Sequence, residues 1–380
     1  SDVCSSDLWL VVKDDCYAEA VEAFQDTSVH ITTEGRRHLG AALGIRSFVE
    51  TYVSSQVSAW VMELEKLSSI ALSQPQAAYC AYVHGLRGKW LYLSRTVPDT
   101  GDLFLPLEEC LRTRFIPALT GRSSPGEVER ALLALPARLG GLGIASPANN
   151  TDAEHQASLH LTHNLICALV QQLPQSAIGN LPPQLSKSEL HQAKQHRLAE
   201  VATGLHLQLP AGLRRARDLA CEKGASSWLT ALPLEEHGFA LHKGAFRDAL
   251  CLRYGWVPER LPPTCVCGSA FGIEHALSCP TGGLPTVRHN EVRDLLAALL
   301  TKVCHDVAIE PVLQPLTGEV FSRRTTSVDD EARLDIKARG FWGGRFDGAF
   351  FDVRVFNPHA PSNRSSTTAS TYRRHERADR

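Results

Sequence analysis

Hydrophobic residues recur at steps of three and four between residues 47 and 72. They are Val49, Val53, Val57, Trp60, Leu64 and Leu67. Such spacing gathers side chains on one face of a helix, so the pattern predicts an amphipathic helix. Pro75 opens the next helical pattern, in keeping with the preference of proline for a first helical turn. Further helical patterns cover 102–116 and, after Pro125, the segment up to residue 135.

Glycine and proline interrupt the helical patterns in two places. The segment 136–144 (PARLGGLGI) breaks regular structure. The polar stretch 171–189 contains three prolines and reads as a linker or an exposed loop within an otherwise helical region. Residues 9–263 are therefore predicted to be mostly helical, and no pattern within them indicates catalytic chemistry.

The pattern changes after Pro263. The segment 287–303 predicts a helix whose apolar face carries Val292, Leu295, Leu296, Leu299 and Val303. Three β-like runs follow, VAIEPVL, ARLDIKA and AFFDVRVF. A helix followed by strands within this length predicts a small α/β or α+β domain. The tail 361–380 is rich in Ser, Thr and Arg and is predicted to be disordered or cut short.

Composition narrows the class of protein. The 380 residues are 43% hydrophobic, which allows a sizeable core and two or three domains. The net charge of −2 means that any contact with nucleic acid must rest on local patches. The eleven cysteines are odd in number and mostly scattered, which favours a reducing compartment.

No signal peptide and no apolar run of about 18 residues is apparent. We therefore expect a nuclear or cytoplasmic protein that is not secreted and does not enter a membrane. Residues 1–8 (SDVCSSDL) can be back-translated into a sequencing-library adapter. They are expected to be an artefact, and the chain is expected to be a fragment.

Cysteine and histidine gather in the segment 265–279. The pattern is C-x-C-x7-H-x3-C, formed by Cys265, Cys267, His275 and Cys279. Four such ligands suit a structural zinc ion, and Gly268 and Gly272 give the turn its freedom. C-x-C is tighter than the usual C-x2-C, so the fourth ligand stays open between Cys265 and His289. The alternative is that buried cysteines cluster here by chance.

Two acids lie on neighbouring predicted strands. Asp335 is in ARLDIKA, and Asp352 and Arg354 share one face of AFFDVRVF. Acids that converge in this way can hold a divalent cation such as Mg²⁺ for phosphodiester cleavage. Glu291 and Glu310 are further ligands or orienting groups in this hypothesis. The alternative is that these charges simply cover half-exposed strands, and Arg354 cannot serve as a base.

Taken together, these motifs resemble a known family. CVCG, HALSCPTGG, RHNEVRD, IEPVLQPLTGE, ARLDI, GFW and AFFDVRVFNP resemble the C-terminal region of reverse-transcriptase proteins of non-LTR retrotransposons. The relevant lineages carry a zinc knuckle followed by a restriction-like endonuclease. WLVVK, HLGAALG, FIPALTGR and ERALLALPARLGGLGI resemble the end of a polymerase palm and its thumb.

The resemblance implies a domain order and site residues. It implies a palm end and thumb over 9–150, a helical linker over 151–263, a zinc knuckle over 264–283 and a nuclease domain over 284–360. The cluster of Cys265, Cys267, His275 and Cys279 falls on the knuckle. Asp335 and Asp352 fall on the two catalytic acids. Arg354 stands where many such nucleases have lysine.

The implied function is a Mg²⁺-dependent endonuclease that nicks target DNA to prime copying of the element's RNA. No Tyr-x-Asp-Asp motif occurs, so this chain alone is not expected to synthesise DNA. The rival prediction is an inactive nucleic-acid-binding remnant whose knuckle still folds. A third is a host-adopted protein that uses its helical part as a partner surface.

Overall fold

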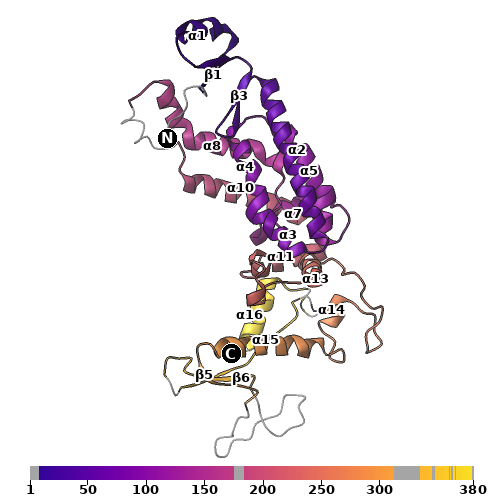
Figure 1. The fold of residues 1–380 in the computed structure, drawn as a ribbon. Coiled ribbons are helices and arrows are strands. Elements are labelled where there is room, and N and C mark those ends of the chain that lie inside the picture. Colours follow the sequence, from indigo (N-terminus) through magenta and orange to yellow (C-terminus); the bar gives the residue numbers. More distant parts are fainter. Residues whose placement is uncertain are drawn as a thin grey trace, which may run out of the picture. The chain divides into compact units, whose positions relative to one another are not determined.

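The computed structural model (Figure 1) divides into two compact units, Ser1–Pro258 and Glu259–Arg380. It describes residues 8–174, 184–311, 334–344, 347–358, 360, 363 and 365–378. The described chain is mostly helical with small sheets, in agreement with the mixed class that the sequence predicts. The expectation about residues 1–8 falls outside the described residues, apart from Leu8.

The larger unit begins with two small sheets. Strand β1 (Trp9–Val11) pairs in parallel with β2 (His30–Thr32), and α1 (Tyr17–Ala23) connects them. Strand β3 (Gly35–His38) forms an antiparallel hairpin with β4 (Ala41–Gly44).

The rest of the larger unit is helical, as predicted. Its α-helices are α2 (Arg46–Ala71), α3 (Pro75–Ala81), α4 (Arg87–Thr96), α5 (Leu105–Cys110), α6 (Ile116–Thr120), α7 (Glu127–Ala134), α8 (Pro147–Val170), α10 (Lys187–Gln208), α11 (Ala211–Ala220), α12 (Ser227–Thr230) and α13 (Lys243–Tyr254). Pro75 occupies the first turn of α3, where its missing N–H costs no hydrogen bond.

The long helix α2 carries the central part of the core. Four of the six positions that the periodicity predicts are buried, namely Val53, Val57, Trp60 and Leu64, and Val49 and Leu67 pack against the same core. The Trp60 ring lies 6.2 Å from the rings of both Trp90 and Phe104. Aromatic burial of this kind dominates core stability, which explains why the helical unit forms around α2.

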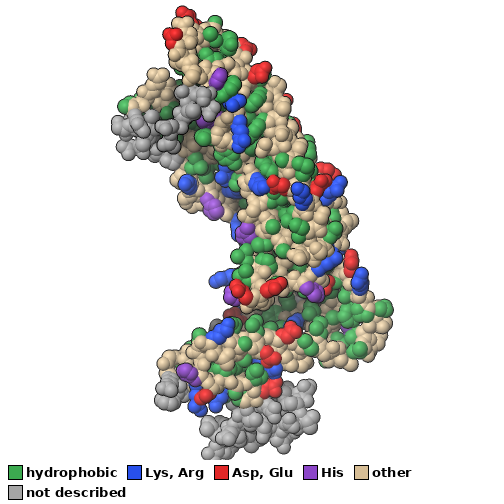
Figure 2. Space-filling model, in the orientation of Figure 1, with side chains coloured by type: hydrophobic (Ala, Val, Ile, Leu, Met, Phe, Trp, Pro, Cys, Tyr) green, Lys and Arg blue, Asp and Glu red, His purple; other side chains and the backbone are tan. Residues whose placement is uncertain are grey.

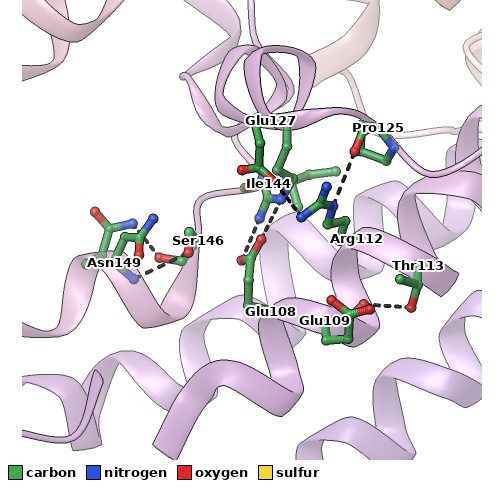
Figure 3. A network of polar contacts seen from close by, with 11 residues as sticks. Glu108, Glu109, Arg112, Thr113, Pro125, Glu127, Ile144, Ser146 and Asn149 are labelled. Atoms are coloured by element: carbon green, nitrogen blue, oxygen red, sulfur yellow. Dashed lines mark hydrogen bonds and ion pairs between the residues drawn. The ribbon is translucent and has the colours of Figure 1, made fainter. Parts of the chain in front are cut away.

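A buried ion pair joins α5 to α7 (Figure 3). The Arg130 guanidinium donates to both oxygens of Glu108, at 2.7 and 2.8 Å, and to the carbonyl of Ile144 at 2.7 Å. The Arg130 side chain is 7% exposed and that of Glu108 is 19% exposed. The buried Arg130 charge is therefore satisfied by the Glu108 carboxylate and one main-chain carbonyl.

Replacing Arg130 by methionine is expected to destabilise the larger unit by about 3 kcal/mol, because it leaves the Glu108 carboxylate half-buried without its partner. Urea denaturation followed by circular dichroism measures this loss. Arg112→Met is the matched control, because Arg112 pairs with Glu127, whose side chain is 82% exposed (Figure 3). Its loss should stay below about 1 kcal/mol. Equal losses for both variants would contradict the assignment.

The smaller unit combines helices with a three-stranded sheet. Its elements are α14 (Ile273–Ala276), α15 (Leu284–Leu300), β5 (His305–Ile309), β6 (Ile336–Arg339), β7 (Gly348–Phe351) and α16 (Thr368–Ala378). The sheet is antiparallel throughout, in the order β5-β6-β7. Each predicted β-like run contributes a strand, but β7 ends at Phe351, before Asp352. Ile336 and Ala338 face the core of this unit, together with Ala297 and Leu300 of α15.

The apolar face of α15 differs from the prediction. The structure buries Arg293, Ala297 and Leu300. Four of the five residues predicted on this face are exposed instead, namely Val292, Leu295, Leu299 and Val303. The buried face packs Ala297 and Leu300 into the core of this unit, and Arg293 on the same face donates to Glu310.

The tail also differs from the expectation of disorder. Residues 368–378 form α16, whose Tyr372 and His375 rings lie 5.6 and 4.0 Å from the Phe356 ring. The aromatic contacts compensate for the poor apolar content of the segment. No helix in the described ranges combines the length and the apolar character needed to span a bilayer.

Candidate metal centre and acidic pair

A short hairpin presents the first two cysteines. Thr264 and Ala270 form an antiparallel bridge, and the N–H of Cys265 donates to the Ser269 carbonyl at 2.8 Å. The turn closes when the N–H of Gly268 donates to the Cys265 carbonyl at 2.9 Å. Gly268 has φ +83°, which a residue with a Cβ adopts only under strain. The tight turn brings Cys265 and Cys267 to the same side, which explains how C-x-C can serve here.

The other two ligands come from one helical turn. Helix α14 carries His275, and its last turn continues until the N–H of Cys279 donates to the His275 carbonyl at 2.8 Å. Residues four apart on a helix share a face, so both side chains point toward the hairpin. Gly272 precedes the helix with extended backbone, so the freedom expected of it is not needed.

The four ligand atoms lie close together. All of them fall within 4.8 Å of one another. The sulfurs of Cys265 and Cys279 are 3.9 Å apart, and the Cys267 sulfur is 3.3 Å from Nε2 of His275. Zn–S bonds of about 2.3 Å and Zn–N bonds of about 2.05 Å in a tetrahedron require separations of about 3.8 and 3.5 Å. The cluster could therefore bind a metal such as zinc with little rearrangement.

The chemistry of the donors agrees with this geometry. Hydrogen bonds from the side chain and backbone of Ser269 lower the pKa of Cys267 to about 6. A thiolate, not a thiol, binds metal, so this cysteine is prepared for coordination near neutral pH. Cys279 is buried and Cys267 is exposed, so the cluster spans the boundary between interior and solvent.

Cys265→Ser should reduce the zinc content of the purified protein, whereas His289→Ala should leave it unchanged. The reason is that Cys265 lies within the cluster, whereas Nε2 of His289 lies 3.1 Å from an Asp335 oxygen. Atomic absorption of both variants measures the zinc. If His289→Ala loses its zinc and Cys265→Ser keeps it, the fourth ligand is His289 and not Cys265.

The two predicted acids adjoin neighbouring strands. In the antiparallel pair, Ile336 faces Phe351 and Lys337 faces Phe350. Asp335 directly precedes β6 and Asp352 directly follows β7, so both stand at the same end of this strand pair. The exposed Asp352 alternates with Phe351 and Val353, which pack against the core.

Asp335 is held by several contacts. One carboxylate oxygen lies 3.1 Å from Nε2 of His289, and the other accepts the N–H of Val353. The Asp335 carbonyl accepts the N–H of Glu310 at 2.8 Å. The side chain of Asp335 is 16% exposed. Since a carboxylate offers about four lone pairs, these contacts fix its position and leave acceptor capacity.

The remaining predicted residues differ in their positions relative to the two acids, and Glu310 adjoins Asp335 through a backbone hydrogen bond. Glu291 is exposed, and two residues along a helix from His289 place it about 200° away, on the other side of α15. Glu310 pairs with Arg293. Arg354 is exposed beyond the end of β7. The contact of His289 with Asp335 was not predicted from the sequence. The available signal was that His289 and Arg293 stand four apart, which places them on the same face of the helix.

Among the described residues, the cluster at Cys265 is the only group of three or more metal-binding side chains that could hold an ion. The acidic pair does not belong to such a group. Asn357 links the chain that follows Asp352 to the segment of the Cys265 cluster, because its side chain donates to the Ser278 hydroxyl at 3.2 Å.

No protein-family model matches the chain, and no curated protein sequence matches it.

Proposed function

We propose that the chain is the C-terminal part of a non-LTR retrotransposon reverse-transcriptase protein whose smaller unit is a metal-dependent DNA endonuclease. The observation that supports the proposal is the register of β6 and β7, because Asp335 directly precedes one strand and Asp352 directly follows the other at the same end of the pair. The Cys265 cluster in the same unit supports a zinc knuckle beside the nuclease.

Asp335 and Asp352 would hold Mg²⁺, which proteins commonly bind through one or two carboxylates together with substrate phosphates. When bound, the ion would neutralise charge that develops on the phosphate during hydrolysis. Arg354, two residues from Asp352, would add a permanent positive charge but could not accept a proton. His289 and the Val353 N–H would keep the Asp335 carboxylate in place.

In this proposal the partners are target DNA and the element's RNA, and the nicked strand primes copying by the polymerase of the parent protein. The absence of a Tyr-x-Asp-Asp motif in the sequence keeps DNA synthesis out of the proposal for this chain.

The second candidate function is binding of nucleic acid without cleavage. The contacts of Asp335 favour it, because both carboxylate oxygens already have partners within the protein. Acids that take part in structural contacts are common on half-exposed strands.

A plasmid-nicking assay separates the two functions. The nuclease should convert supercoiled plasmid to open circles only when Mg²⁺ is present. An inactive remnant should retard the same plasmid in a gel and leave it supercoiled with Mg²⁺ or Mn²⁺. Retardation without nicking would overturn the nuclease proposal.

A further inference from the structure

A cavity of about 490 Å³ opens on the surface of the larger unit. It lies between the C-terminal half of α2, helix α6 and α13. Its walls include Ser68, Ser69, Leu72 and Pro117. This volume falls in the range of sites for small ligands or single nucleotide units.

Three arginines and one acid supply the charge of the cavity. Arg114, Arg122 and Arg247 line it together with Glu65. Three guanidinium groups against one carboxylate give a local charge of +2. The Arg114 Nε lies 3.5 Å from Glu65, and the Arg114 side chain is 65% exposed, so this pair neutralises the cavity only weakly.

The other two arginines are held in place by neutral groups. Arg247 donates to the carbonyls of Ala118 and Leu119, at 2.6 and 3.4 Å. It packs over Gly121, where a Cβ would come within 3.1 Å of the Arg247 side chain. The Arg122 guanidinium lies 4.6 Å from the centre of the Trp256 ring. Arginines fixed in this way lose little conformational freedom when they bind an anion.

Arg122 and Arg247 form no ion pair with a carboxylate in the described part of the chain. Several other arginines of this unit likewise lack such a pair among the described residues, whereas Arg46 pairs with Glu50 and Arg95 with Glu154. Figure 2 shows basic and acidic side chains interspersed on the visible face of the unit. What distinguishes Arg122 and Arg247 is that neutral groups hold both of them at one cavity, so their positive charge is available to an external anion.

We infer that this cavity binds a backbone phosphate of a nucleic-acid strand, independently of base sequence. Guanidinium groups match phosphate oxygens in geometry and charge. The Trp256 ring is buried beneath Arg122, and no aromatic side chain lines the cavity, so the described residues offer no platform on which to stack a base. Phosphate contacts fix the register of a strand without reading its sequence. The inference rests on the proposed role in nucleic-acid chemistry.

The test is the salt dependence of binding to a labelled single-stranded oligonucleotide, measured by fluorescence anisotropy on the full chain without Mg²⁺. The variant Arg114→Gln/Arg122→Gln removes two phosphate contacts. At 0.15 M salt it should bind about 10-fold to 30-fold more weakly, and its slope of log K against log salt should fall by about 1.4, since each contact with a single strand contributes about 0.7. Arg46→Gln, an arginine paired with Glu50, is the matched control and should change neither quantity. Thermal unfolding verifies that the variants fold.

Two results would overturn the inference. One is a double variant that behaves like Arg46→Gln. The other is displacement of the oligonucleotide by inorganic phosphate or adenosine monophosphate as effectively as by an unlabelled strand, because the ligand would then be a free phosphate. Since no cleavage takes place in this assay, its failure is distinct from a failure of plasmid nicking.

Discussion

Replacing Asp352 by asparagine is expected to reduce Mg²⁺-dependent nicking by at least about 100-fold. Asparagine keeps the size of the side chain but removes the negative charge that would attract the cation. A 100-fold loss corresponds to about 2.7 kcal/mol of transition-state stabilisation. Since Asp352 is exposed, the substitution should leave the fold intact. Quantification of open-circular plasmid over time measures the rate.

Asp335→Asn should cause a loss of similar size, because the two acids would act on one ion. The control is Asp306→Asn, on β5 of the same sheet. Asp306 pairs with Arg339 at 3.1 Å and has φ +49°, a conformation that asparagine tolerates well. Its nicking rate should equal that of the parent. If all three variants nick equally fast, the acidic pair has no part in cleavage.

Removal of a zinc ion bound at the Cys265 cluster is expected to unfold the segment between Pro263 and Gly283. Structural zinc contributes about 10–16 kcal/mol of apparent binding free energy in small zinc-binding domains. Only a short hairpin and one helical turn would remain to hold this segment without it. A chelator should therefore make Cys265, Cys267 and Cys279 reactive toward a thiol reagent and open the segment to proteolysis.

Cys16 provides the internal control for this measurement, because it is exposed in the larger unit and should react equally with and without chelator. The increase in proteolysis should extend to the chain after Asp352, since Asn357 donates to Ser278 in the same segment as the cysteine cluster. A protein purified without zinc, whose three thiols react at a rate that the chelator does not change, would show that the cysteines cluster without a metal.

The sequence predicts the helical unit well because its pattern is local. The three-to-four spacing from Val49 to Leu67 anticipates α2, and Pro75 marks the start of α3. The ligand set is likewise visible, because three cysteines and one histidine fall within one short segment. Whether Cys265 or His289 completes it depends on the turn at Gly268, which C-x-C spacing alone does not reveal.

The contacts of the acidic pair were harder to predict because they depend on tertiary pairing. Helix α15 buries Ala297 and Leu300 together with Arg293, which donates to Glu310, and it leaves Val292, Leu295 and Leu299 exposed against their apolar periodicity. This rotation also brings His289 to Asp335 and turns Glu291 away. In AFFDVRVF, Phe351 and Val353 pack against the core and alternate with the exposed Asp352, although β7 ends at Phe351.

The most direct test of the nuclease account is anomalous diffraction from crystals of the protein soaked in Mn²⁺, a stand-in for Mg²⁺. The account predicts one manganese peak in contact with carboxylate oxygens of both Asp335 and Asp352. A structure in which the two carboxylates point apart, with no manganese between them, would contradict it.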